Sequence, residues 1–262
     1  MQSKPLIRIW LSVLSFIIIS IAAGAYDQVP KHLEIGRALL SSLSDKDTSY
    51  RYHSLVKWKG DPSTTRTEAH TDCSGLASSL LKRASCSQIL HQHIKNPRST
   101  YPLAEDYFSY ISKQEGFKRI NSIADIRPGD IIAIKYIVGN SAKDTGHVML
   151  IDAIPAHRKG GTKPIIKGTR QWDVAVIDSA TSPHGKTDTR YGKNGQKRNG
   201  VGRGVIRLYS REDGEVVGYT WSTLRNSVYY DKSSRPLAIG RVLCYSDKVV
   251  AGTAVTAAVH GR

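Results

Sequence analysis

Three residues far apart in the sequence, Cys73, His147 and Asp178, are of the types that cysteine hydrolases use as nucleophile, general base and orienting group. Cys73 precedes a segment with apolar residues at helical spacing, so we expect it at a helix N-terminus. There the helix dipole and unpaired N–H groups favour a thiolate and can also hold an oxyanion. Most single cysteines are small buried hydrophobes. The joint occurrence of the three residue types in this order favours nucleophilic catalysis.

The hydrophobic periodicity predicts the elements that position these residues. Helices are expected over residues 32–43, from about 73 to 83 and from about 101 to 114, while 44–72 is expected to be a loop. Strands are expected over residues 131–138, 147–154, 172–178, 206–210, 216–221 and 237–245. The turn Glu212-Asp213-Gly214 predicts a hairpin. Helices followed by closely connected strands predict an α+β domain, in which N-terminal helices pack on an antiparallel β-sheet.

The strand that ends at Asp178 is expected to lie beside the strand that begins at His147. Three short motifs surround the candidate residues: Asp72-Cys73-Ser74-Gly75-Leu76, Arg127-Pro128-Gly129-Asp130-Ile131 and Gly146-His147-Val148-Met149-Leu150. In combination, over about residues 50–180, they resemble the signatures of the NlpC-type cell-wall cysteine peptidases, which have the CHAP amidases as relatives. The resemblance implies a papain-like fold, an acyl-enzyme mechanism and hydrolysis of peptide or amide bonds in bacterial peptidoglycan. It implies no cofactor and no metal.

The resemblance also implies a role for each catalytic candidate. Cys73 corresponds to the nucleophile, His147 to the base, and Asp178 to a third polar position at which the family accepts several residue types. The gap of 31 residues between His147 and Asp178 is longer than usual in that family. His184 is therefore the alternative third residue.

Three further residues are implied in substrate binding. Asp72 and Ser74 match positions that contact the free amine of a stem peptide in some members of the family. Trp58, in Trp58-Lys59-Gly60, loosely resembles an aromatic-glycine segment ahead of the family's cysteine. The expected partners are peptidoglycan stem peptides or the wall polymer, and an inhibitor or immunity protein is left open.

The first 25 residues have the pattern of a secretory signal peptide. Lys4 and Arg8 precede an apolar run over 9–23, which ends in Ala23-Gly24-Ala25. The alternative is an uncleaved anchor, although the run is short of the ~20 residues that a spanning helix needs. We expect an exported, periplasmic or secreted protein with a hydrolase domain over 26–247, a flexible tail over 248–262 and no membrane span after processing.

The chain is strongly basic, with 38 Lys and Arg against 22 Asp and Glu, a formal charge of +16. Removal of Lys4 and Arg8 with the signal peptide leaves +14. Many cations lie in two Gly- and Lys-rich insertions, 155–171 and 184–204, which are expected to be either functional or disordered loops. The charge alone fits nucleic acid, an anionic lipid surface, an acidic polymer outside the cytoplasm, or solubility without a partner. Export and the lack of a nucleic-acid-binding motif argue against nucleic acid, and the resemblance implies the anionic wall polymer.

Three cysteines exclude a disulfide-stapled miniprotein and a four-thiolate zinc site. Cys86 and Cys244 are expected either to pair in an oxidising compartment or to be two unrelated buried thiols. Two alternatives to the hydrolase are kept: a non-catalytic wall-binding protein on the same fold, and an acyl transferase or effector amidase.

Overall fold

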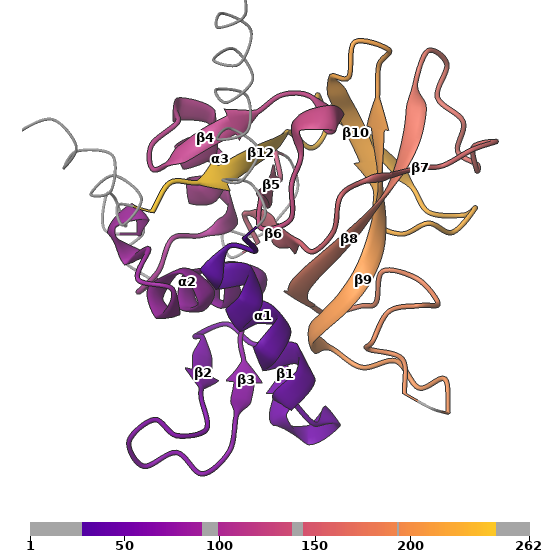
Figure 1. The fold of residues 1–262 in the computed structure, drawn as a ribbon. Coiled ribbons are helices and arrows are strands. Elements are labelled where there is room, and N and C mark those ends of the chain that lie inside the picture. The colour runs from indigo at the N-terminus through magenta and orange to yellow at the C-terminus, as the bar shows by residue number, and fades with distance from the viewer. Residues whose placement is uncertain (1–27, 91–98, 138–143, 193, 245–262) are drawn as a thin grey trace, which may run out of the picture.

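The computed structural model describes residues 28–90, 99–137, 144–192 and 194–244 (Figure 1). The predicted signal peptide and the predicted tail over 248–262 lie outside this part of the chain. Among the described helices, none combines the length and apolar character that crossing a membrane requires.

The three predicted helices are confirmed within a few residues. Helix α1 spans Lys31–Ser42, α2 spans Cys73–Arg83 and α3 spans Ala104–Lys113. Three short 3₁₀ helices accompany them: Asp45–Asp47, Ser87–Ile89 and Ile123–Asp125. Helix α2 contacts both α1 and α3, so the three helices form one layer (Figure 1).

The second layer is an antiparallel sheet of nine described strands. Eight of them follow the order β11-β10-β9-β8-β6-β5-β12-β4, and the ninth, β7, pairs with β8. The strands are β4 (Phe117–Ile120), β5 (Ile131–Lys135), β6 (Gly146–Ile151), β7 (Ala156–His157), β8 (Arg170–Ala180), β9 (Gly200–Ser210), β10 (Val216–Thr220), β11 (Tyr229–Asp231) and β12 (Leu237–Val242). The predicted β9–β10 hairpin and the predicted pairing of β6 with β8 are both confirmed. Helices on an antiparallel sheet make this an α+β protein.

The sheet is buried on both faces where it lies under the helices. In β5, Ile131 and Ala133 belong to the core cluster shared with the helices, whereas Ile132 and Ile134 belong to a second cluster on the opposite face. A strand buried on both faces is a continuous apolar run, which explains why the sequence predicted this part of the sheet well. Helices α2 and α3 both contact β6, and α2 also contacts β8.

The segment 44–72, predicted as a loop, instead contains a second small sheet. Its strands are β1 (Thr48–Ser49), β2 (Leu55–Lys57) and β3 (Glu68–His70), in the order β1-β3-β2, with β1 parallel to β3. Strands of two or three residues are too short to show a period-two pattern, so the sequence could not reveal them. The backbone amide of Val201 in β9 donates a hydrogen bond of 2.8 Å to Thr48 Oγ1, which connects this small sheet to β9.

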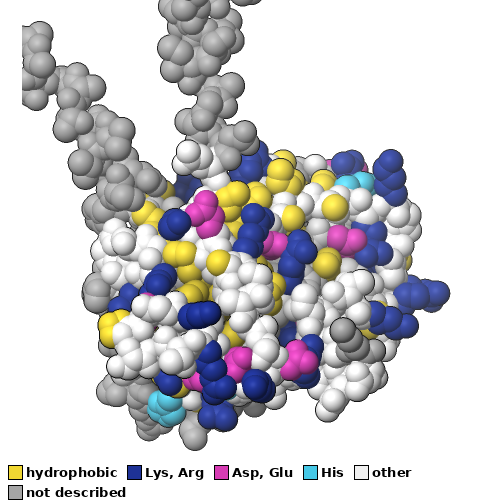
Figure 2. All heavy atoms as spheres, turned by 60° about the horizontal axis from the view of Figure 1, so that its bottom comes forward, with side chains coloured by type: hydrophobic (Ala, Val, Ile, Leu, Met, Phe, Trp, Pro, Cys, Tyr) yellow, Lys and Arg dark blue, Asp and Glu magenta, His cyan; other side chains and the backbone are white. Residues whose placement is uncertain are grey.

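In their described residues, the two basic insertions are partly built into the sheet, which contradicts the expectation of disordered loops and leaves a functional role open. Residues 156–157 form β7, and 170–171 begin β8. Residues 200–204 belong to β9, which the sequence predicted only from 206 onward. Figure 2 shows Lys and Arg side chains spread over the face at the bottom of Figure 1, interspersed with acidic and hydrophobic side chains. The charge on this face is therefore dispersed and forms no single basic patch.

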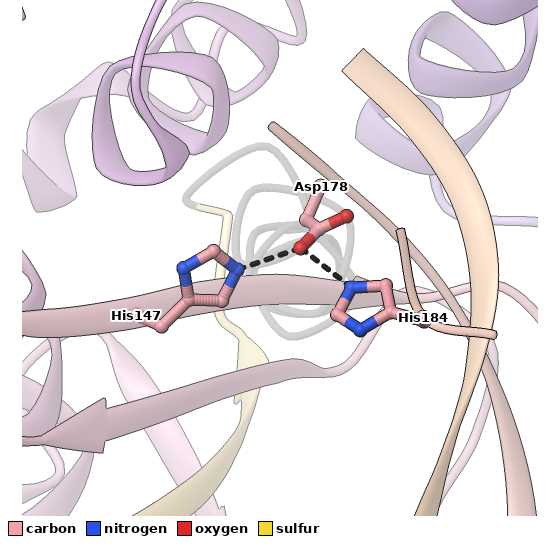
Figure 3. A group of neighbouring side chains, drawn as sticks. All are labelled: His147, Asp178 and His184. Carbon is pink, nitrogen blue, oxygen red and sulfur yellow. Dashed lines mark hydrogen bonds and ion pairs between the residues drawn. The ribbon is translucent and has the colours of Figure 1, made fainter. Parts of the chain in front are cut away.

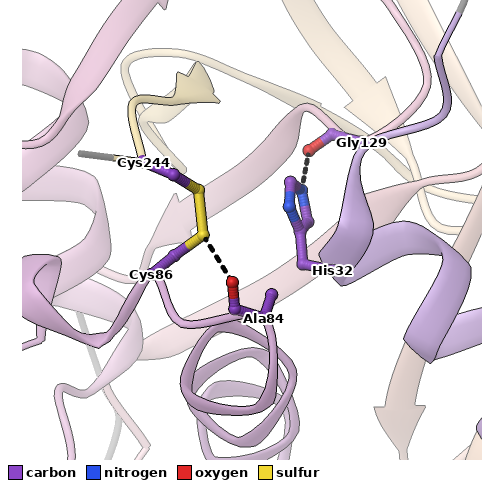
Figure 4. Close-up of a disulfide and its surroundings, with 5 residues drawn as sticks. All are labelled: His32, Ala84, Cys86, Gly129 and Cys244. Carbon is purple, nitrogen blue, oxygen red and sulfur yellow. Dashed lines mark hydrogen bonds between the residues drawn. A yellow bond between two sulfur atoms is a disulfide. The ribbon is translucent and has the colours of Figure 1, made fainter. Parts of the chain in front are cut away.

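Cys86 and Cys244 form a disulfide with Cα atoms 5.0 Å apart (Figure 4). The sequence left open whether these two cysteines pair or are unrelated thiols, and the structure shows that they pair. The bond links the region just after α2 to the end of β12, across 158 positions of the chain. Cys73 remains a free thiol.

Candidate active site

The N-terminus of α2 is fixed by Asp72, the N-cap residue. Its Oδ1 accepts hydrogen bonds from the backbone amide of Gly75 at 2.7 Å and from the Ser74 hydroxyl at 3.2 Å. Its Oδ2 accepts one from the Tyr101 hydroxyl at 2.8 Å. An N-cap carboxylate satisfies helix amides that otherwise lack a partner, so the helix begins at Cys73 as predicted.

The thiol of Cys73 is buried, with only 4% of the residue exposed. Burial raises the pKa of the Cys73 thiol, and the nearby Asp72 carboxylate raises it further. The backbone amides of Val148 and Ser74, which lie beside the sulfur, act in the opposite direction. The thiolate expected from the helix N-terminus is thus not favoured in this state, because desolvation of the anion outweighs those amides.

His147 and Asp178 meet across the β6–β8 pair, in which Leu150 lies opposite Ile177. His147 Nε2 is 2.6 Å from Asp178 Oδ2. His184 Nε2 is 2.8 Å from the same oxygen, so one carboxylate oxygen lies between two imidazole rings (Figure 3). The two candidates for the third residue are therefore neighbours: Asp178 contacts His147, and His184 contacts Asp178.

The other oxygen of Asp178 is bound by an arginine from the second basic insertion. Arg190 Nη2 donates to Asp178 Oδ1 at 2.8 Å, and its Nε and Nη2 donate to Asp188 at 2.9 Å each. All these groups are almost fully buried. Burial alone would raise the pKa of the Asp178 carboxyl, but Arg190 and His184 hold that pKa well below its usual range. Asp178 is therefore ionised at neutral pH.

The two histidine rings differ in what their second nitrogen faces. His184 Nδ1 is 2.8 Å from the carbonyl oxygen of Trp221, so both of its ring nitrogens lie beside oxygen atoms. The guanidinium of Arg190 lies beside the carboxylates of both Asp178 and Asp188. His147 uses Nε2 toward Asp178, which leaves Nδ1 as its nitrogen for proton exchange.

Two glycines of β9 make room for this buried cluster. A Cβ on Gly202 would lie 2.5 Å from Arg190 Nε, and one on Gly204 would lie 2.7 Å from His184 Cβ and still closer to Asp188 Oδ2. Glycine within a strand often marks the close approach of another chain segment. The glycine content of 184–204 thus permits the segment to fold back over β9 and reach Asp178.

A cavity of about 280 Å³ opens beside His147. Its lining includes Trp221, whose ring centroid is 4.8 Å from that of His147, and the tyrosines Tyr50, Tyr52 and Tyr136. Burial raises the pKa of Tyr50, and proximity to Cys73 raises it further, so this cavity residue is also near the cysteine. Cys73 itself is not among the lining residues, so a ligand in this cavity lies beside His147.

The three predicted substrate-binding residues do not line this cavity. Asp72 and Ser74 are buried at the start of α2, where the Ser74 hydroxyl donates a hydrogen bond to the Asp72 carboxylate. Trp58 lies under the guanidinium of Arg83, 5.2 Å from ring centroid to Cζ. Their binding roles stay predictions.

Two charged residues that line the cavity, Asp144 and Arg235, were missed by the sequence analysis. Neither has a sequence signal, because each lies in a polar stretch between strands.

The group His147, Asp178 and His184 also has the composition of a metal site, with candidate ligand atoms within 4.8 Å of one another. Two features fit a hydrogen-bonded network better. The Nε2 atoms of His147 and His184 both lie within hydrogen-bond distance of the same Asp178 oxygen, and the Arg190 guanidinium already neutralises that carboxylate. A divalent cation here would be repelled by the neighbouring guanidinium.

The fold and site thus define an α+β protein with a buried cysteine at a helix start and a histidine–carboxylate pair on adjacent strands. No family model and no solved structure matches the chain. It is 37% identical over 226 residues to the uncharacterized protein R653 of Acanthamoeba polyphaga mimivirus, an alignment that covers 82% of this chain and 98% of the viral protein. The chain belongs to the same family as that protein.

Proposed function

We propose that the protein is an exported, papain-like cysteine hydrolase that cleaves peptide or amide bonds in bacterial peptidoglycan. The observation that carries this proposal is the 2.6 Å contact between His147 and Asp178, beside a free cysteine at the start of α2. The sulfur of Cys73 lies next to the amide of Val148, the residue that follows His147. Nucleophile, base and orienting group therefore come from one helix and two paired strands.

In the proposed reaction His147 Nδ1 accepts the proton of the Cys73 thiol as the sulfur attacks the substrate carbonyl carbon. The tetrahedral intermediate collapses when its C–N bond breaks, and the leaving amine takes the proton from His147. Water, deprotonated by the same nitrogen, then attacks the thioester and releases the acid and the thiol. Asp178 keeps Nε2 protonated and stabilises the imidazolium that forms.

Proton transfer during the attack is required because the thiol starts protonated. Burial raises the pKa of the Cys73 thiol and so disfavours a resting thiolate. His147 therefore acts as a true general base. The amides of Val148 and Ser74, which lie beside the sulfur, are the proposed donors to the oxyanion.

Two further observations support export and a wall substrate. The Cys86–Cys244 disulfide is of the kind that persists in oxidising compartments. The basic composition suits a substrate embedded in an anionic polymer.

The test is digestion of purified muropeptides, with products weighed by mass spectrometry. Wild type is expected to release products that Cys73→Ser and His147→Ala do not. His157→Ala is the matched control, because His157 is exposed, does not line the cavity and only meets the ring of Trp172 at a tilt of 59°. Cleavage by Cys73→Ser equal to that by wild type would refute the proposal.

One observation favours a second candidate, a wall-binding protein without catalysis. The thiol is 4% exposed, which is more typical of a structural cysteine than of a reactive one. That candidate predicts sacculus binding without products. An acyl transferase would be recognised in the same digestion by products in which an added amine, in place of water, has taken the acyl group.

A further inference from the structure

The cavity beside His147 contains a guanidinium with unusual surroundings. The Cζ atom of Arg235 lies 3.8 Å from the ring centroid of Tyr230 and 4.3 Å from that of Tyr136, and all three residues line the cavity. It also lies near the hydroxyl of Tyr219. Two aromatic rings hold the guanidinium in place through cation–π contacts.

This guanidinium has no ion-pair partner among the residues that the structure describes. The arginine beside the catalytic candidates is paired by contrast, because Arg190 binds both Asp178 and Asp188. A fixed, half-buried cation without a carboxylate, facing a cavity, is arranged to accept an anionic group from outside the protein.

The cavity's acidic residue lies apart from Arg235. Asp144 is close enough to Tyr50 and Tyr52 to raise the pKa of both hydroxyls, after the larger effect of burial. No ion pair joins Asp144 to Arg235 in the described residues, although both line the same cavity. A ligand that meets both residues therefore encounters opposite charges at separate places.

We propose that Arg235 binds a carboxylate of the substrate, so that the enzyme selects peptides with a free carboxylate close to the cleaved bond. This assignment rests on the proposed function, because in a peptide substrate the available anions are carboxylates. A guanidinium matches a carboxylate with two parallel hydrogen bonds. Since His147 and Arg235 line one cavity of about 280 Å³, the carboxylate and the scissile bond belong to neighbouring residues of the substrate.

The test compares two forms of one peptidoglycan stem tripeptide, with its carboxylates free or converted to carboxamides. Wild type is expected to favour the free form by about tenfold or more in kcat/KM, mainly through KM, as expected for a charge-assisted hydrogen bond. Arg235→Gln is expected to remove most of this preference, and Arg235→Lys to retain part of it because it keeps the charge.

Arg225→Gln is the matched control, since it removes the same charge from an exposed arginine outside this cavity. It is expected to keep the full preference for the free carboxylate. An equal loss in Arg225→Gln would show a non-specific charge effect, and wild type that cleaves both forms equally would overturn the assignment. This wild-type comparison decides the question even if Arg235→Gln fails to fold.

A binding experiment separates this inference from the proposed function. Calorimetric titration of Cys73→Ser protein with the two tripeptides reports carboxylate recognition without turnover. Tighter binding of the free form, lost in the Cys73→Ser/Arg235→Gln double variant, supports the subsite even if no peptide is ever cleaved. Cleavage without any difference between the two forms supports the hydrolase and refutes the subsite.

Discussion

Replacing Arg190 with glutamine tests whether the second basic insertion maintains the charge state of the candidate site. In the wild type, Arg190 is 2% exposed and donates to both Asp178 and Asp188. Arg190→Gln leaves two buried carboxylates without their guanidinium, and the His184 ring remains beside Asp178. Burial then raises the pKa of the Asp178 carboxyl, since the strongest opposing charge is gone.

The expected magnitude follows from the burial of the pair. Removing one partner of a buried ion pair costs about 3–5 kcal/mol, a large part of the ~5–15 kcal/mol that stabilises a typical domain. Exposed pairs contribute only about 0–1 kcal/mol. Arg211→Gln, which breaks the exposed pair of Arg211 with Glu215, is therefore the control.

The stability difference between wild type and Arg190→Gln is expected to depend on pH in a defined direction. The wild-type Asp178 carboxyl has a depressed pKa, so its stabilisation is present above the unfolded pKa of about 3.9 and is lost only as pH falls through the lower folded pKa. In Arg190→Gln the folded pKa is higher, and protonation of Asp178 removes the unpaired charge. The difference between the two proteins is thus largest at pH 7 and shrinks as pH falls toward 4.

Urea unfolding, followed by tryptophan fluorescence at pH 7 and pH 4, measures this difference. The reasoning is refuted if Arg190→Gln costs no more than Arg211→Gln at pH 7. It is equally refuted if the cost of Arg190→Gln is the same at both pH values.

Three other changes have defined outcomes. Asp178→Asn is expected to lower kcat by about 10²–10⁴-fold, less than loss of Cys73 or His147, because an orienting group assists the base without replacing it; unchanged turnover of muropeptides would contradict this. Labelling of Cys73 by iodoacetamide is expected to accelerate about tenfold per pH unit from pH 6 to 8, because only the thiolate reacts and burial raises the thiol pKa; a flat rate would indicate a resting thiolate–imidazolium pair. The Cys86→Ser/Cys244→Ser double variant is expected to lose about 2–4 kcal/mol in urea unfolding without reductant, and unaltered stability would argue against the bond.

The sequence predicted the elements that have strong periodicity. The apolar run of β5 and the amphipathic α2 were located because their residues pack against a continuous core. The contact between His147 and Asp178 was foreseen because the sequence placed each at the end of a strand and the two strands were expected to pair. In the structure His147 is the second residue of β6, and β8 continues past Asp178 to Ala180. The short strands β1 to β3 and the cavity residue Arg235 were missed, since contacts between distant segments create them and no local pattern marks them.

The basic insertion 184–204 shows that a count of charges does not predict where the charged side chains lie. Counting charges treats Arg190 as one more surface cation, whereas it is buried on Asp178. Arg198 and Arg203 of the same segment form ion pairs with Asp45 and Asp152. Neutralising the cations of this segment to test wall binding would therefore also disturb the fold. Such a variant cannot separate an effect on binding to the wall polymer from an effect on folding.

Helix α2 keeps two kinds of sulfur chemistry apart. Cys73 begins the helix and Cys86 follows its end, so the 11 residues of α2, about 16 Å of helix at ~1.5 Å per residue, lie between the two positions. Exchange between a thiol and a disulfide requires direct attack of one sulfur on another, and the intact helix keeps these two positions at its opposite ends. A formed α2 therefore disfavours wrong pairing of Cys73 with Cys86.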